Sequence, residues 1–172
     1  MSDSSLMNED VNGITMRPAT VDDDEFLFKL YASTRSDELA AVGWNDQQRD
    51  TFLRMQYNLQ RGSHQETGGH IILSRGREIG RLIVKQTEEA MLLVDIVILP
   101  PFRNRGIGTS VMESLLEDAT VAGKPVRLHV LASSFARRLY ERLGFVIVDG
   151  DFANIVGAEA YVRMIWTPTR AP

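Results

Sequence analysis

Between a predicted strand and a predicted helix lies the stretch Arg103-Asn104-Arg105-Gly106-Ile107-Gly108. The strand before it, residues 91–99, is apolar apart from Asp95 and is followed by two residues, Pro100 and Pro101, that cannot donate ladder hydrogen bonds. The helix after it, residues 107–122, repeats apolar residues at helical spacing. A glycine-bearing turn at a helix start leaves several backbone N–H groups unpaired, with the positive end of the helix dipole behind them. The stretch therefore predicts a cradle for an anion, and a phosphate is the natural ligand.

The composition sets limits on the class of protein. With 172 residues, of which 44% are hydrophobic and 24% charged, the chain is typical of one globular domain with a sizeable core. Its formal net charge of −4 argues against nucleic acid as the main partner, because such proteins usually carry a basic patch. No apolar run approaches the ~18 residues of a membrane span, and the first residues lack the features of an export signal. We therefore expect a cytoplasmic protein without a membrane partner. The absence of cysteine excludes disulfides, thiolate metal sites and a cysteine nucleophile.

Hydrophobic periodicity and turn residues predict the order strand, two helices, three strands, helix, strand, helix, two strands. We expect residues 1–12 to be a flexible tail and residues 13–168 to form one domain. The elements expected besides those that flank the anion cradle are a strand at 14–17, a helix capped by Thr20, a helix at 45–61, a hairpin at 70–84, a strand at 126–130, a helix from Ser133 or Ser134 to Gly144, and strands at 145–148 and 160–166. In the second helix, Phe52, Met55 and Leu59 are expected to face inward, with Tyr57 as a further candidate. Early hairpins followed by strand–helix–strand crossovers imply an α+β fold: a mixed, mostly antiparallel twisted sheet of about six to seven strands with about four helices on its two faces.

Two motifs resemble those of a known family. The loop at 100–108 is similar to the coenzyme A loop of GNAT-type N-acetyltransferases, whose pattern is Gln/Arg-x-x-Gly-x-Gly/Ala behind a strand. The stretch Leu139-Tyr140-Glu141-Arg142-Leu143-Gly144-Phe145 resembles the second family signature, a helix that ends in Leu-Tyr-x-x-x-Gly-Phe. A dinucleotide-binding fold fits less well, because it needs a different glycine spacing after the first strand. The resemblance covers about residues 13–166 and implies the GNAT (acyl-CoA N-acyltransferase) fold in a single-domain protein of bacterial type.

The resemblance also implies a binding site for acetyl-CoA as co-substrate, with no metal. Backbone donors from about Arg105 to Thr109 would hold the pyrophosphate, and Arg103 and Arg105 would add charge. The loop residues implied in binding are Arg103, Asn104, Arg105, Gly106, Ile107, Gly108 and Thr109. Where many members carry an asparagine that contacts pantetheine, this chain has Ser133 followed by Ser134; helix capping is the other use of these serines. The backbone N–H near Val97 or Ile98 would stabilise the oxyanion, because family members splay this strand from its neighbour there.

Acetyl transfer to an amine needs a route for the amine's proton and a proton or hydrogen bond for the leaving thiolate. The resemblance implies that the Tyr140 hydroxyl gives a proton or a hydrogen bond to the leaving thiolate. The alternative role of Tyr140 is packing within the core. Asp95 lies where many members carry an acidic residue that faces the acceptor, and the alternative is a carboxylate paired with an arginine. His129 lies at a position similar to the glutamate base of ribosomal-protein N-terminal acetyltransferases, and a histidine ordinarily titrates near pH ~6.5. Asp95, His129 and a water chain all remain open as the base.

The predicted function is therefore direct transfer of an acetyl group from acetyl-CoA to a primary amine of a small molecule or of a protein. The alternative is an acyl-CoA-binding sensor or interaction module on the same fold, without catalysis. Charged and aromatic residues that would flank the acceptor are Asp37, Glu38, Trp44 and Tyr57. The apolar last strand, around Tyr161 to Trp166, would support a homodimer, and a packed edge is the other interpretation.

Overall fold

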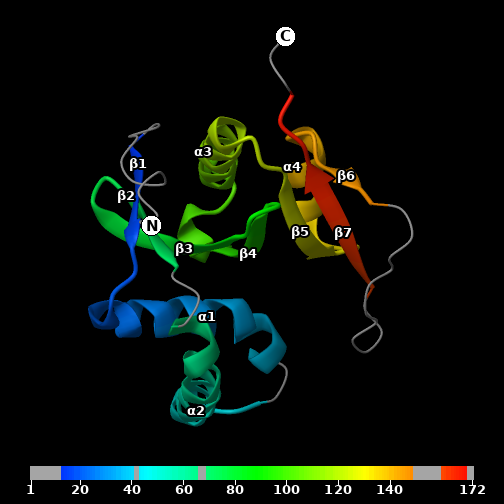
Figure 1. Ribbon diagram of the computed structural model, residues 1–172. Helices are drawn as coiled ribbons and strands as arrows, with labels where there is room; N and C mark the ends of the chain where they lie inside the picture. The colour runs from blue at the N-terminus through cyan, green and yellow to red at the C-terminus, as the bar shows by residue number, and fades with distance from the viewer. Residues whose placement is uncertain (1–12, 41–42, 66–68, 149–159, 170–172) are drawn as a thin grey trace. The chain divides into compact units, whose positions relative to one another are not determined.

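The computed structural model describes residues 13–40, 43–65, 69–148 and 160–169 (Figure 1). Its strands form a seven-stranded sheet in the order β1-β2-β3-β4-β5-β7-β6. The elements are β1 (Ile14–Pro18), the 3-10 helix η1 (Val21–Asp23), α1 (Asp24–Ala40), α2 (Asp46–Gln65), β2 (His70–Ser74), β3 (Arg77–Gln86), β4 (Met91–Ile98), the 3-10 helix η2 (Pro100–Phe102), α3 (Ile107–Ala122), β5 (Val126–Leu131), α4 (Phe135–Arg142), β6 (Val146–Ile147) and β7 (Tyr161–Trp166). The predicted order of strands and helices is confirmed.

The sheet is mixed and mostly antiparallel, as predicted. Strands β1 and β2, β2 and β3, β5 and β7, and β6 and β7 pair antiparallel. Strands β4 and β5 pair parallel, and their register runs from Met91 opposite Val126 to Leu93 opposite Leu128. A parallel pair needs a long crossover, which the chain provides with α3. The α+β fold class is therefore confirmed.

Contacts divide the described chain into two compact units, each made of two segments. The first unit contains residues 13–83 and 95–107, and we call it the N-terminal unit. The second contains residues 84–94 and the described residues from 108 onward, and we call it the C-terminal unit. The boundaries 1–12 and 13–168 of the sequence analysis stay a prediction, and residues 1–12 lie outside the described part.

A β-bulge in the N-terminal unit shapes the end of β4. The register between β2 and β3 shifts between the pair Ile72–Gly80 and the pair Leu73–Glu78, so Ile79 is an extra residue on β3. A Cβ added to Gly80 would lie 2.4 Å from the Val97 carbonyl oxygen, closer than real atoms approach. Only glycine allows β3 to pass this close to β4. The bulge thus fixes where the last residues of β4 lie within this unit.

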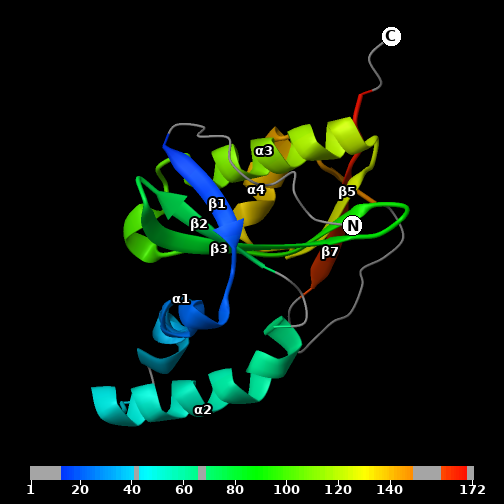
Figure 2. The ribbon, with the colours of Figure 1, turned by 60° about the vertical axis from the view of Figure 1, so that its left-hand side comes forward.

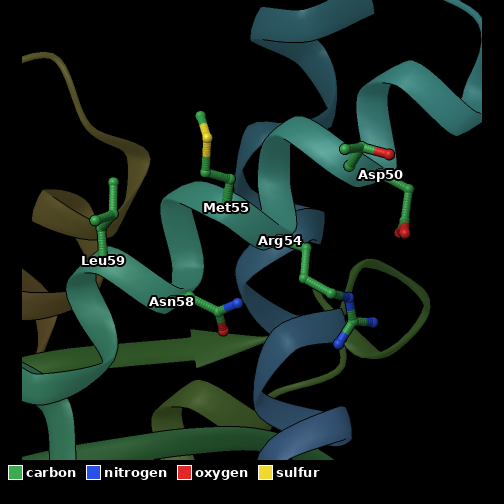
Figure 3. A pocket seen from close by; sticks show the side chains of 6 residues that line it. Asp50, Arg54, Met55, Asn58 and Leu59 are labelled. Atoms are coloured by element: carbon green, nitrogen blue, oxygen red, sulfur yellow. The ribbon is translucent and has the colours of Figure 1, made fainter.

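The helices α1 and α2 of the N-terminal unit lie beside each other (Figures 1 and 2). Their shared core consists of Phe28, Leu53 and Tyr57. The prediction that Met55 and Leu59 face inward is wrong, because their side chains are 55% and 79% exposed. Leu53 and Tyr57, four residues apart, define the buried face of α2, and Met55 lies about 200° round the helix from Leu53. Figure 3 shows Met55 and Leu59 on one side of α2, with Arg54 and Asn58 pointing elsewhere.

Thr20 caps the short 3-10 helix η1 rather than α1 itself. Its backbone N–H donates to the Asp23 carboxylate over 2.7 Å, which completes a capping box. Asp23 is buried and also accepts two hydrogen bonds from the Arg17 guanidinium, at 2.6 and 2.8 Å. The same guanidinium lies 2.8 Å from Glu78 on β3. This ion pair therefore fastens the start of the first helical segment to the sheet strands of its own unit.

In the C-terminal unit, α3 buries Val111, Met112, Leu115 and Ala119, which recur at helical spacing. The helix ends at Ala122 and is followed by Gly123, whose φ of 65° is the left-handed conformation that glycine adopts after helix ends. Strand β5 lies between the first residues of β4 and β7, and β6 forms the edge beyond β7 (Figure 1). None of the helices in the described part of the chain is long and apolar enough to cross a membrane.

Candidate active site

The loop between β4 and α3 has the strand–turn–helix form that the sequence predicts. Leu99, just after β4, donates its N–H to the Ile79 carbonyl oxygen at 2.8 Å, and η2 follows. Asn104 and Gly106 then have φ angles of 59° and 80°, and α3 begins at Ile107. Arg103, before Asn104, has an extended backbone. The chain therefore passes twice through the left-handed region within three residues before the helix starts.

This backbone sequence is suited to anions. Left-handed residues alternating with others turn successive N–H groups toward one side and form a concave nest of donors. The first N–H groups of α3, at Ile107, Gly108 and Thr109, lack helical partners and add the positive end of the dipole. Residues 103–106 are exposed, while Ile107 is buried and anchors the helix start. Gly106 is the glycine that the turn requires, because its φ is positive, whereas Gly108 lies within the first turn of α3.

Arg103 connects the loop to the end of β4. Its Nε donates to the Ile98 carbonyl oxygen at 2.7 Å. This bond uses one donor of the guanidinium and leaves its two terminal nitrogens for an anion. Arg105, two residues later, is exposed and lies against the Phe102 ring. Both arginines of the predicted cradle thus lie in the N-terminal unit, together with the last residues of β4.

Asp95 of β4 is paired with an arginine. Its Oδ2 accepts a hydrogen bond from Arg81 of β3 over 2.5 Å, with side-chain exposures of 31% for Asp95 and 15% for Arg81. Pairing with an arginine was the predicted alternative to a catalytic role for Asp95. Arg81 was missed, although it is the single charged residue inside the apolar part of the β3 sequence and could have been proposed as a partner. Val97 and Ile98, further along β4, are half-buried.

His129 lies on β5 in the C-terminal unit, and its side chain is exposed. It lies directly opposite Arg163 of β7, and Arg127 shares its face of β5. Within the described part of the chain, no hydrogen bond or ion pair of the His129 side chain is found. The base candidates thus differ in kind: Asp95 is ion-paired, and His129 is exposed among cationic neighbours.

Tyr140 is buried at 5% exposure in α4 and packs against Phe145, with ring centroids 5.6 Å apart. Ser134 caps this helix, since its hydroxyl accepts from the Ala136 N–H at 3.2 Å, as the sequence analysis allowed. Ser133, one residue earlier in the turn after β5, is exposed and makes no capping bond. Strand β5 leads straight into this cap, because the Ser134 N–H donates to the Leu131 carbonyl oxygen at 2.9 Å. The catalytic and pantetheine candidates beyond β4 thus all lie within one strand-to-helix segment of the C-terminal unit.

Residues suggested to flank an acceptor have mixed placements. Trp44 packs edge-on against Phe52 at 5.0 Å and is half-buried. Tyr57 is buried and its hydroxyl donates to the Asp24 carboxylate at 3.0 Å, so its ring belongs to the helix core. The side chains of Asp37 and Glu38 lie outside the described residues. Among the described side chains, no cluster of three His, Asp or Glu residues could hold a metal ion.

Sequence comparison relates the central part of the chain to a known family. The sequence model of the acetyltransferase (GNAT) domain matches residues 66–147, which include β4, the anion cradle, α3, β5 and α4. This part of the chain is similar to the GNAT acetyltransferases. No functionally curated protein matches the chain.

Solved GNAT structures share the fold. The ribosomal-protein-S18-alanine N-acetyltransferase from Escherichia coli has 21% identity and a TM-score of 0.61, with 92% of this chain and 96% of that chain covered. The PaiA N-acetyltransferase from Thermoplasma acidophilum, in complex with coenzyme A, has 18% identity, a TM-score of 0.60 and coverages of 87% and 97%. Arabidopsis thaliana Naa50, in complex with the bisubstrate analogue CoA-Ac-MVNAL, has 19% identity, a TM-score of 0.56 and coverages of 88% and 97%. The GNAT fold predicted from two short motifs is confirmed.

Proposed function

We propose that this protein is an acetyl-CoA-dependent N-acetyltransferase that passes the acetyl group directly to an amine. The observation that carries the proposal is the nest of backbone donors between Arg103 and Thr109, with left-handed residues at 104 and 106 and a helix start behind them. Such a nest suits a pyrophosphate, since fixed N–H donors lose little entropy when the anion binds. Two of the structural relatives hold coenzyme A or a coenzyme A conjugate, which supports the assignment.

The residues of the loop between β4 and α3 fit the phosphates of acetyl-CoA. Gly106, at φ 80°, has nothing within 4 Å of a Cβ position, so the space above the nest is open to a ligand. The terminal nitrogens of Arg103, whose Nε is bonded to Ile98, would add charge for the phosphates. When bound, acetyl-CoA would supply an acetyl group activated as a thioester. The chain would bind the phosphates through the loop, and Ser133 would donate one hydrogen bond to the pantetheine arm.

We propose that Tyr140 interacts with the thioester sulfur, which leaves as the coenzyme A thiolate. A phenol, at pKa ~10, is a weaker acid than a thiol, at ~8.5, so full proton transfer is uphill by about 2 kcal/mol. Donation of a hydrogen bond from Tyr140 is therefore the role we propose, and burial against Phe145 would hold the ring in place. The backbone N–H at Val97 or Ile98 would stabilise the oxyanion.

For the amine's proton, His129, Asp95 and a water chain are the candidates. The Arg81 ion pair occupies one oxygen of Asp95, which makes this carboxylate better suited to orient Arg81 than to take up a proton. His129 is exposed and keeps both ring nitrogens for an acceptor or a water. We therefore favour His129 as the base. Two structural relatives are an S18-alanine N-acetyltransferase and a protein bound to CoA-Ac-MVNAL, which supports a protein or peptide amine as one acceptor class.

The proposal is tested by calorimetric titration with acetyl-CoA and by thiol release with panels of small amines and peptides. We expect saturable binding and turnover on at least one class of amine. Tyr140→Phe should lower kcat by about tenfold to a hundredfold, the value of one hydrogen bond to a developing charge, and leave acetyl-CoA affinity unchanged. Tyr31→Phe, which removes a hydroxyl bonded to Gln56 in the helix core, is the matched control. Binding without turnover on any amine would instead indicate a coenzyme A sensor.

A further inference from the structure

Two arginines, Arg77 and Arg105, lie over the aromatic ring of Phe102, at the start of the anion cradle. Arg77, the first residue of β3, has its guanidinium carbon 5.3 Å from the Phe102 ring centroid, and that of Arg105 lies 5.9 Å away. Arg103 follows Phe102 directly in the chain. All four residues belong to the N-terminal unit. Arg77 is distant from the others in sequence, so its presence here results from the fold.

These guanidinium groups are not neutralised within the described part of the protein. Among the described residues, Arg77, Arg103 and Arg105 form no ion pair with a carboxylate. Glu78, the neighbour of Arg77, is already paired with Arg17 at 2.8 Å. Two exposed cations that share one aromatic ring, Arg77 and Arg105, with Arg103 next to that ring's residue in the chain, stand out in a protein whose formal net charge is −4. Such a patch suits an anion that arrives from outside.

The Phe102 ring gives two of these arginines a defined position. An arginine on an aromatic face gains cation–π attraction and keeps its N–H edge available for hydrogen bonds. Side chains held in this way lose less entropy on binding than free ones. Arg77 and Arg105 are therefore arranged to offer planar pairs of donors, which match phosphate oxygens.

We propose that Arg77, together with Arg105 on the Phe102 ring, binds the 3′-phosphate of coenzyme A. This inference rests on the proposed function. The coenzyme carries phosphate in two places, a pyrophosphate and a ribose 3′-phosphate. The backbone nest at 104–109 and Arg103 serve the pyrophosphate. Arg77 comes from another strand and contributes no backbone donor to the nest, so it serves the remaining group, a dianion for which paired guanidinium donors are the fitting ligand.

The test compares coenzyme A with 3′-dephospho-coenzyme A on the intact protein. Calorimetric Kd values are measured for the wild type, Arg77→Ala and Arg77→Gln. We expect both substitutions to weaken coenzyme A binding by about tenfold, as for one charge-assisted contact at an exposed site. Neither should change the Kd for 3′-dephospho-coenzyme A. Arg35→Ala removes an arginine that lies 5.5 Å from the Tyr31 ring, outside the patch, and should change neither Kd.

The outcomes separate this inference from the function on which it rests. Equal losses for both coenzymes would place Arg77 at the pyrophosphate or in the fold and would overturn the assignment, as would an unchanged Kd for coenzyme A. If the wild type bound neither coenzyme, the proposed function itself would fail. Melting temperatures of the variants, measured alongside, show whether each remains folded, and Arg77→Gln keeps most of the side-chain stem in case the alanine variant is destabilised.

Discussion

Replacement of Asp23 by asparagine should destabilise the protein in a way that depends on pH. The hydrogen bonds from Arg17 are the main cause that lowers the pKa of Asp23 from 3.8 to about 2; burial opposes this shift and the Thr20 N–H adds to it. Asp23 is 5% exposed, but the Arg17 side chain is 35% exposed, so solvent screens part of the interaction and the expected effect is smaller than the full shift. A shift of nearly two pKa units corresponds to about 2.5 kcal/mol of stability.

The direction with pH follows from proton uptake. Between pH 4 and pH 2 the unfolded chain protonates this carboxyl group while the folded chain keeps it charged, so a falling pH favours unfolding. The contribution is fully present above about pH 4 and is lost as the pH falls through about 2. In the Asp23→Asn variant the side-chain amide oxygen would still accept the Thr20 hydrogen bond, so the cap survives and the loss concerns the charge.

The assay is urea unfolding of the wild type and Asp23→Asn at a series of pH values from 7 to 2. We expect the variant to be less stable by about 2 kcal/mol at pH 7, with the difference shrinking toward zero near pH 2. Other carboxylates titrate in both proteins and cancel in this difference. Asp22→Asn, at the exposed neighbouring position, should change stability by less than about 0.5 kcal/mol. A difference that stays constant over the whole pH range, or no difference at pH 7, would refute the reasoning.

Three further predictions concern the end of β4, the anion cradle and the candidates for the base. Gly80→Ala should lower the free energy of unfolding by about 2–3 kcal/mol in urea titrations, because the new Cβ would lie 2.4 Å from a carbonyl oxygen of β4; wild-type stability would mean that the bulge relaxes freely. Gly106→Val should raise the Kd for acetyl-CoA more than Arg103→Ala does, since a β-branched residue at φ 80° distorts the nest; equal, unchanged affinities would remove the site assignment. His129→Gln should lower kcat/KM by about a hundredfold, whereas Asp95→Asn should lower it less, and the reverse order would make Asp95 the base.

The sequence allowed the fold to be predicted because the two motifs carry local signals. Two prolines end the apolar strand at 91–99, because they cannot donate ladder hydrogen bonds. The turn before the next helix needs a glycine at position 106, where φ is positive. Both features depend on neighbours in the chain, so no tertiary information is required. The same holds for Ser134, whose capping bond spans two residues.

Features that depend on tertiary contacts were missed. The inward face of α2 was predicted to carry Met55 and Leu59, with Tyr57 as a further candidate. Packing against α1 buries Tyr57 together with Leu53, which was not predicted, and leaves Met55 and Leu59 exposed. Arg81 and Asp95 are 14 residues apart, and their pairing requires the hairpin register. The bulge at Ile79 leaves a single glycine as its trace in the sequence. Such positions can be predicted only once the strand partners are known.

The end of β4 is where these tertiary features converge. Gly80 lets β3 approach Val97, and the Leu99 N–H bonds to Ile79 at the bulge. Because Arg103 then bonds to Ile98, the position of the cradle's first arginine is set by the same bulge. Arg77 lies three residues before Gly80 on β3, and its guanidinium reaches the Phe102 ring. A substitution in β3 that removes the bulge should therefore disturb coenzyme binding as well as stability, although β3 contains none of the family's motif residues.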